Sequence, residues 1–248
     1  MKKLSLLFVL ILAMGLSAAP ALAQGTGPTI TAQLNPLNTS GSSGTATVVV
    51  NGNQVTVTIE ARGLSPNLPH AQHIHIGGQN ICPTNAADDD GDGLINTVEG
   101  QPFYGPVQVS LTTTGDVSAN SALAVDRFPV AAADGSLSYS RTFQLPAGVT
   151  LADLRNGVIV QHGISELFGD PTQYDGEPRS SLTPDLPLEA TIPSNCGKLV
   201  LADTFDGGDT MLSPTSKDDC KNGGWKTFGF KNQGQCIRFV NTGKDSRP

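Results

Sequence analysis

The sequence predicts an all-β domain with many turns, and three observations support this fold class. Residues 45–50 and 54–62 alternate apolar and polar side chains with a period of two, the pattern of a sheet with one buried and one wet face. Gly numbers 28 and Pro 17, whereas aromatic residues make up only 5% of the 248 residues. Only residues 150–157 carry the start and stop signals of a helix. These features argue against a helical bundle.

Residues 1–23 are typical of a secretory signal peptide. A positively charged start precedes an apolar run over 4–16, and Ala21-Leu22-Ala23 matches a cleavage signature, so the mature chain is expected to begin at Gln24. The apolar run is too short to cross a bilayer, and no other stretch is suited to do so. We therefore predict a secreted, extracellular or periplasmic protein without a transmembrane segment.

The charge of the chain is distributed unevenly. Residues 24–216 carry 6 Lys and Arg against 19 Asp and Glu, a balance of −13, whereas residues 217–248 carry 7 against 3, a balance of +4. An acidic body repels nucleic acid and anionic lipid and is suited to gathering cations. We therefore expect metal ions and no nucleic acid as partners. The basic C-terminal tail is suited to contact with an acidic cell surface or matrix.

The β domain is expected over residues 24–202, with its elements in the following order. Residues 24–43 form a loose entry or a first edge strand. A hairpin follows, joined by Asn51-Gly52, a dipeptide favoured in two-residue turns. Long loops fill 77–105 and 163–186. After the histidine-bearing strand described below, further strands are predicted over 107–111, 137–145, 158–162, 188–192 and 198–201.

Four cysteines indicate disulfides, because the chain is predicted to be exported and their number is even. Of the three connectivities, we expect Cys82–Cys196 with Cys220–Cys236, since the last two are close in sequence and share the tail. A zinc site is disfavoured because no CxxC pair exists. Residues 203–216 are predicted to be a linker. Residues 217–248 are predicted to form a disulfide-closed β-hairpin module, which is too small to build a core alone.

Three of the four histidines, at positions 70, 73 and 75, lie within the short stretch 70–78. If this stretch is a strand, His73 and His75 project from one face and Ile74 and Ile76 from the other. Two imidazoles side by side can chelate copper or zinc. The alternative is a pair of solvated histidines on an exposed strand, which is the commoner outcome for an isolated pair of this kind.

The pattern His70-x-x-His73-x-His75-x-x-Gly78 resembles the copper-site strand of the Cu/Zn superoxide dismutases. Residues 157–162 are similar to that family's late strand, which brings another copper histidine. Cys82 and Cys196-Gly197 are similar to its disulfide. The resemblance covers residues 44–201 and implies a Greek-key β-sandwich or barrel in which His70 is structural. The copper ligands that it implies are His73, His75 and His162.

The chain departs from that family in ways that point to a second resemblance. No histidine stands between His75 and His162, so a zinc site of the family type is excluded. Residues 192–195 occupy the place of the active-site arginine, whose charge guides an anionic substrate. The chain resembles more closely the CHRD (chordin-like) domains of exported bacterial proteins, which have a His-Ile-His-type strand and a late strand ending in His-Gly. This second resemblance implies a fold more than a function.

Residues 88–99 match the 12-residue calcium loop at the positions where that loop requires an oxygen ligand or a glycine. Gly93 provides the sharp turn. The flanking segments 83–85 and 100–102 predict no helices, so we expect a lone structural loop and not an EF-hand; the alternative is a solvated acidic loop. The expected calcium ligands are Asp88, Asp90, Asp92, Leu94, Asn96 and Glu99.

The sequence therefore predicts a secreted metal-binding module of structural or binding role, with calcium and copper as its cofactors and no catalytic residue. The alternative is a copper-only enzyme similar to superoxide dismutase. The two hypotheses differ in whether copper at the histidine site turns over superoxide.

Overall fold

The computed structural model describes residues 28–175, 177–202, 214, 216–221, 223–228, 230–242 and 244. The predicted signal peptide and nearly all of the predicted linker lie outside these residues.

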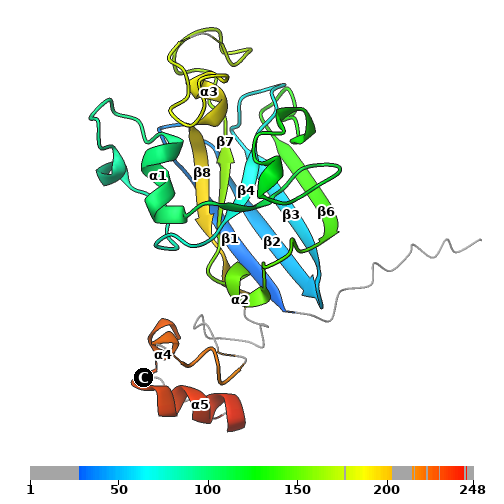
Figure 1. Ribbon diagram of the computed structural model, residues 1–248, viewed down its shortest axis with the longest axis vertical. Helices are drawn as coiled ribbons and strands as arrows, with labels where there is room; N and C mark the ends of the chain where they lie inside the picture. Colours follow the sequence, from blue (N-terminus) through cyan, green and yellow to red (C-terminus); the bar gives the residue numbers. More distant parts are fainter. Residues whose placement is uncertain are drawn as a thin grey trace, which may run out of the picture.

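The main body is a curled antiparallel sheet, like a barrel or sandwich, with strand order β5-β4-β7-β8-β1-β2-β3-β6; β9 pairs with β1 (Figure 1). The molecule is mostly β, which supports the predicted barrel- or sandwich-like class, while Greek-key connectivity stays a prediction. The strands are β1 (Thr29–Pro36), β2 (Ser43–Asn51), β3 (Gln54–Arg62), β4 (Gln72–His75), β5 (Val107–Ser110), β6 (Leu137–Gln144), β7 (Val158–His162), β8 (Pro193–Lys198) and β9 (Val200–Leu201).

The predicted hairpin is confirmed by β2 and β3, but its turn lies one residue later than the predicted Asn51-Gly52. Asn51 pairs with Gln54, so Gly52 and Asn53 form the turn, and Gly52 adopts a φ of +63° that suits a residue without Cβ. Val48 and Val57 face each other in the core, fully buried. Threonines and other polar side chains alternate with them on the wet face, as the period of two predicts.

The first strand is not at an edge of the sheet. β1 pairs with β2 along most of its length, and on its other side with β9 through Ile30 and Thr31 and with β8 through Asn35 and Pro36. The loose entry or edge strand expected for residues 24–43 is therefore wrong for the described part of that range. Ile30 and Leu34 are fully buried and join the main core. Buried and more exposed side chains alternate along β1, but the Gly- and Ser-rich composition around the strand concealed this pattern.

β4 and β7 are buried on both faces, and this places the candidate site. Ile74 and Ile159 lie opposite each other and belong to the main core. On the reverse face, Val158 and Val160 pack with Tyr104 and Cys196 in a second apolar cluster. The reverse face is covered by long connections instead of a second sheet, and those connections carry the helices α1 and α3. Figure 1 shows both helices beside this part of the sheet.

Two regions of the main body form α-helices where the sequence predicted none. Residues 97–104 of the predicted loop form α1 (Thr97–Tyr104), and residues 188–191 of a predicted strand form α3 (Leu188–Thr191). The predicted helix is confirmed as α2 (Leu151–Leu154), with Thr150 as N-cap. Both misassigned segments are short, and a short apolar run does not distinguish a helix from a strand. Single turns of 3₁₀-helix occur at η1 (Asn85–Ala87), η2 (Ala119–Ser121) and η3 (Val125–Arg127).

The two predicted disulfides are confirmed. Cys82–Cys196 joins the segment that follows β4 to strand β8, with Cα atoms 5.8 Å apart, and Cys220–Cys236 closes the C-terminal module. Such pairs are typical of exported proteins. Within the part of the chain described, no helix is both long and apolar enough to cross a membrane.

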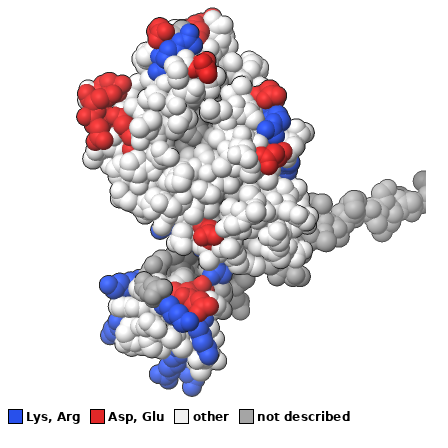
Figure 2. Space-filling view, viewed as in Figure 1, with Lys and Arg blue, Asp and Glu red and all other residues white. Residues whose placement is uncertain are grey.

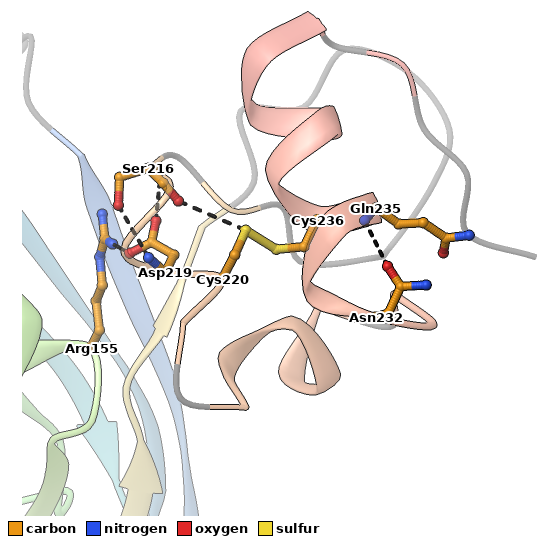
Figure 3. Close-up of a disulfide and its surroundings, with 7 residues drawn as sticks. All are labelled: Arg155, Ser216, Asp219, Cys220, Asn232, Gln235 and Cys236. Carbon is orange, nitrogen blue, oxygen red and sulfur yellow. Dashed lines mark hydrogen bonds and ion pairs between the residues drawn. A yellow bond between two sulfur atoms is a disulfide. The ribbon is translucent and has the colours of Figure 1, made fainter.

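The C-terminal module is helical, so the predicted hairpin is wrong for its described residues. It contains α4 (Gly224–Thr227) and α5 (Gln233–Thr242). Apolar side chains in α5 recur with helical spacing at Cys236, Ile237, Phe239 and Val240, and they pack around the disulfide. In Figure 3, Asp219 lies between the body and this disulfide: it forms an ion pair with Arg155 beside α2 and accepts a hydrogen bond from the Ser216 amide.

Candidate metal centre

Strands β4 and β7 bring three histidines together. His73 pairs with Val160 and His75 with Val158, while the His162 amide donates to the Ala71 carbonyl at 2.8 Å. Residues 71, 73 and 75 therefore share one face with residues 158, 160 and 162. One ring nitrogen of each histidine lies within 4.8 Å of the others. The sequence could assign His73 and His75 to one face, but only the β4–β7 register brings His162 beside them.

Each of these rings uses one nitrogen to bond a backbone carbonyl. The contacts are His73 Nε2 to Ala122 O at 3.0 Å, His75 Nδ1 to Gly105 O at 2.8 Å, and His162 Nδ1 to Thr191 O at 2.6 Å. A carbonyl only accepts, so each of these nitrogens carries the proton. The other nitrogens, His73 Nδ1, His75 Nε2 and His162 Nε2, keep their lone pairs. They are buried and, among the described residues, have no hydrogen-bond partner.

Burial holds all three imidazoles in the neutral form. It lowers the pKa of His73 well below the usual value near 6.5, that of His75 to about 3, and that of His162 to about 4. Repulsion between the rings lowers the pKa values of His73 and His75 further. The carbonyl contacts act in the opposite direction and are weaker. Neutral imidazole with a free lone pair is the form that binds a metal.

The carbonyls that orient the rings come from three separate connections. Ala122 follows η2, Gly105 ends α1, and Thr191 ends α3. A carbonyl bonded to the second ring nitrogen is the usual support of a metal-ligating histidine, because it fixes the tautomer and orientation. Sequence analysis missed these three residues. Any residue offers a carbonyl, so no side-chain pattern could have identified them.

Aromatic rings pack against two of the histidines. The ring centroid of Tyr104 lies 4.5 Å from that of His75, and the centroid of Phe128 lies 5.2 Å from that of His73, both in edge-on arrangements. Tyr104 is fully buried, and its hydroxyl donates to the Thr97 carbonyl at 3.0 Å. These contacts restrict the rotation of the imidazoles and keep their free nitrogens converging.

The three histidines line a small pocket of about 40 Å³. A water molecule needs roughly 10–15 Å³ measured in this way, so the pocket has room for an ion with a small further ligand. None of the residues that line it is charged. Its outer part includes Leu123 and Leu182, which are 47% and 45% exposed. The pocket therefore connects the three converging ring nitrogens to an apolar rim.

The fourth histidine does not belong to this group. His70 is fully buried, with Nδ1 2.8 Å from the His162 carbonyl and Nε2 3.0 Å from the Ser65 carbonyl. Both nitrogens thus face backbone carbonyls, only one of which can accept from a neutral ring, and His70 is not among the described groups of side chains that could hold a metal. His70 instead connects the turn before β4 to the end of β7, which fits the structural role that the dismutase resemblance implies.

The acidic loop brings three of its four predicted carboxylate ligands together. Carboxylate oxygens of Asp88, Asp90 and Glu99 lie within 4.8 Å of one another. Asp92 Oδ1 accepts the Leu94 amide at 2.8 Å, and the Leu94 side chain packs against the apolar cluster beside α3. The structure thus supports three of the predicted calcium ligands as a cluster.

Helix α1 begins inside the predicted calcium loop, which corrects the expectation of a loop without helices. Asn96 is the N-cap: its side chain accepts from the amides of Val98 and Glu99 at 2.9 and 3.2 Å. Glu99 completes a capping box by accepting the Asn96 amide at 2.8 Å. The Asn-x-x-Glu spacing signals this cap, but Pro102 concealed the helix.

Asn38 is a further structural residue that sequence analysis missed. It is buried, has a φ of +52°, and its side chain accepts the Ile95 amide at 2.6 Å. It also donates to the carbonyls of Ile95 and Pro193, each at 2.9 Å. The end of the acidic loop is thereby fastened to β8. Asparagine tolerates this backbone conformation better than most residues, which was the only available signal.

No protein-family model matches this chain, and no curated protein matches its sequence. The resemblance to CHRD domains and to superoxide dismutases therefore rests on the residues and their order in the sequence.

Proposed function

We propose that this protein is an exported, CHRD-like module that binds one transition-metal ion, preferably copper, through His73, His75 and His162 in a binding or structural role. One observation carries the proposal: three buried ring nitrogens converge without a partner, and the opposite nitrogen of each ring is fixed by a carbonyl. Leaving buried polar atoms unsatisfied costs about 1–3 kcal/mol each, so this arrangement is explained by a ligand that all three share.

Copper is preferred because of the donor set. Three imidazole nitrogens without thiolate or carboxylate suit copper, zinc, iron or nickel, and among divalent ions of this series copper binds most tightly. Bound copper would supply one-electron redox chemistry. The residues of the chain would position it, keep the donor nitrogens unprotonated and exclude most water from the site.

The test is copper binding to the mature protein, measured by metal analysis after dialysis and by calorimetry in competition with zinc. We expect one copper per chain, with zinc bound more weakly. His162→Gln removes one of three donors and should lower copper affinity at least tenfold, whereas Gln144→Ala, at an exposed position of β6, should not change it. Equal copper binding by the two variants would refute the site.

We propose further that the loop 88–99 binds calcium and is ordered by it. Three clustered carboxylates in an exposed loop repel one another, and a divalent cation would remove that repulsion. Extracellular calcium modules bind at roughly 10⁻⁴–10⁻³ M. A hundredfold excess of calcium over its Kd would then stabilise the fold by about 2.7 kcal/mol.

Asp90→Asn tests the calcium loop. It removes one negative charge while keeping an acceptor for the Asp92 amide, which Asp90 Oδ1 binds at 3.1 Å. Calcium should raise the melting temperature of the wild type and of the control Asp185→Asn, but not that of Asp90→Asn. Glu99→Ala is a poorer test, since it also breaks the α1 capping box and should destabilise the chain even with a chelator present. An equal calcium response in all variants would contradict the assignment.

Superoxide conversion by the same histidines is the second candidate function, and the resemblance to the dismutases favours it. The uncharged lining of the pocket and the acidic body weigh against rapid capture of an anion. A superoxide assay on the copper-loaded protein separates the two. Turnover that is lost in His162→Gln would replace a binding role by an enzymatic one.

Export is part of the proposal. The two disulfides are typical of an extracellular or periplasmic location, and the N-terminal sequence supports secretion with cleavage after Ala23. N-terminal sequencing of the secreted protein should return Gln24 as the first residue. Contact of the basic tail with a cell surface would show as lower retention on cells when residues 217–248 are deleted.

A further inference from the structure

An apolar hollow of about 190 Å³ opens beside the three-histidine pocket. Ala71, Val125, Leu186 and Ala190 line both spaces, so the hollow and the histidine pocket adjoin. These residues come from the start of β4, from η3 and from the segment around α3. The hollow is larger than the histidine pocket, and metal binding by the three nitrogens does not require it.

The aromatic walls of the hollow are held in place by the fold. Phe128 is 4% exposed, and its ring packs edge-on against His73. The hydroxyl of Tyr174 donates to the Pro69 carbonyl at 3.1 Å, and its ring packs edge-on against His70 at 6.3 Å between centroids. A ligand would therefore meet a surface that is already formed, which lowers the entropic cost of binding.

The size and charge of the hollow restrict what it can take. A cavity of roughly 150 Å³ in another protein holds benzene, and drug-sized molecules need roughly 300 Å³ or more. None of the residues that line the hollow is charged. Four carboxylates stand directly beside lining residues in the sequence, against one cation, so the surroundings would repel an anion; they are Asp126, Asp175, Asp185 and Glu189, and the cation is Arg127.

We propose that this hollow binds a small uncharged aromatic molecule of about one ring next to the metal. Such a ligand would fill space between Phe128, Tyr174 and the alanines at positions 71 and 190. Because the Phe128 ring touches His73, the ligand would also contact the support of a metal-ligating residue. Its place beside the metal rests on the proposed function, whereas its binding to the hollow does not.

Three probes test the class of ligand on the metal-free mature protein. Benzamide is an uncharged aromatic ring, benzoate has the same shape with a negative charge, and acetamide lacks the ring. In NMR spectra with labelled methyl groups, benzamide should shift the signals of Val125 and Leu186 in a saturable way. Benzoate should bind about tenfold more weakly, and acetamide should not saturate. Benzoate binding as tightly as benzamide, or no saturable shift with benzamide, would overturn the proposal.

A variant that fills the hollow tests its location. Ala190→Leu adds apolar volume at a half-buried position and should weaken benzamide binding about tenfold or more. Ala147→Leu makes the same change at an exposed position outside the hollow and should leave binding unchanged. Unchanged benzamide affinity in Ala190→Leu, with the fold verified by the NMR spectrum, would refute the location.

A spectroscopic measurement separates this proposal from the metal site. Benzamide added to the copper-loaded protein should change the electron paramagnetic resonance spectrum of Cu(II), and Ala190→Leu should abolish that change. If copper does not bind but benzamide still saturates the metal-free protein, the proposed function fails and the hollow remains a ligand site. If both bind but the spectrum stays constant, the ligand does not lie beside the metal and that part of the inference is wrong.

Discussion

At the scale of the residue, the chemistry of the candidate site depends on which nitrogen of each histidine is free. His73 offers Nδ1, whereas His75 and His162 offer Nε2, because the carbonyls of Ala122, Gly105 and Thr191 engage the other nitrogens. Each ring therefore has one tautomer, and the backbone of three separate connections determines which lone pairs are free. Histidine identity alone does not determine this.

The buried histidines make the stability of the metal-free protein depend on pH. The pKa of His75 is lowered to about 3 and that of His162 to about 4 by burial, whereas in the unfolded chain both have ordinary values near 6.5. At pH values between the folded and unfolded pKa, the unfolded state binds more protons than the folded state. The contribution of the two neutral rings to stability is therefore complete above pH about 6.5 and is lost as the pH falls.

We expect the free energy of unfolding of the metal-free protein to fall by on the order of 1 kcal/mol per ring between pH about 6.5 and about 5. Urea denaturation at the two pH values measures the change. His162→Gln should show a smaller pH dependence than the wild type. A wild-type stability that stays constant over this range would mean that the rings are accessible to protons in the folded protein.

At the scale of the element, α1 connects the acidic loop to two of the three histidines. At its start, the Thr97 hydroxyl donates at 2.5 Å to the Thr191 carbonyl, which also accepts from His162. At its end, the Gly105 carbonyl accepts from His75. One short helix thus positions both supports, and its cap contains Glu99 of the acidic loop.

Gly105→Ala tests the role of this helix end. A Cβ at position 105 would lie 2.5 Å from the Gly78 amide nitrogen, so the carbonyl that orients His75 would have to move. We expect copper affinity to fall about 10–100-fold, the usual cost of disturbing the support of a ligand. Gly148→Ala is the matched control: its φ of +87° resembles the +92° of Gly105, but no atom lies within 4 Å of its added Cβ. Equal losses in the two variants would assign the effect to backbone strain alone.

The element scale is also where sequence-based prediction was least reliable. The hairpin of β2 and β3 was predictable because its side chains alternate and its turn contains Gly52. Helix α3 was predicted as a strand because its four residues are too few to show a helical period. In the C-terminal module, the Cys236 to Val240 run has helical spacing, but the glycine-containing segments 222–224 and 232–234 favoured the turns of a hairpin.

At the scale of the whole molecule, the Cys82–Cys196 bridge holds the segment with α1 against the sheet. It spans 114 residues and lies in the apolar cluster of Tyr104, Val158 and Val160, on the same face as the three histidines. The second bridge, Cys220–Cys236, spans 16 residues and lies within the C-terminal module. The two bridges therefore stabilise different parts of the molecule.

Removing each bridge by a pair of Cys→Ser changes should separate these roles. Loss of Cys82–Cys196 should cost about 2–5 kcal/mol of stability and weaken copper binding, because the Gly105 carbonyl is no longer held near His75. Loss of Cys220–Cys236 should leave copper affinity unchanged. Denaturation and copper titration measure both effects. Weaker copper binding in the second variant would show that the module contributes to the site.

Charge is also separated at this scale. Figure 2 shows acidic side chains gathered at one side of the body and basic side chains on the module. Among its described residues, the module carries Lys217, Lys221, Lys226, Lys231, Arg238 and Lys244. Where the two parts meet, the charges are the other way round: the acidic body supplies the cation Arg155, and the basic module supplies the carboxylate of Asp219. Such a contact favours one orientation of the module on the body.

The sequence by itself determined the all-β class, the disulfide pairing, the acidic loop and the shared face of His73 and His75. These follow from periodicity and spacing, which are local properties of the chain. His162 was expected beside this pair only through the family resemblance, and the tertiary structure brings it there. Only the tertiary structure decided that three carbonyls orient the rings and that an apolar hollow adjoins them. The physical reason is that strand register and loop packing join residues far apart in sequence, and backbone carbonyls leave no mark in a sequence.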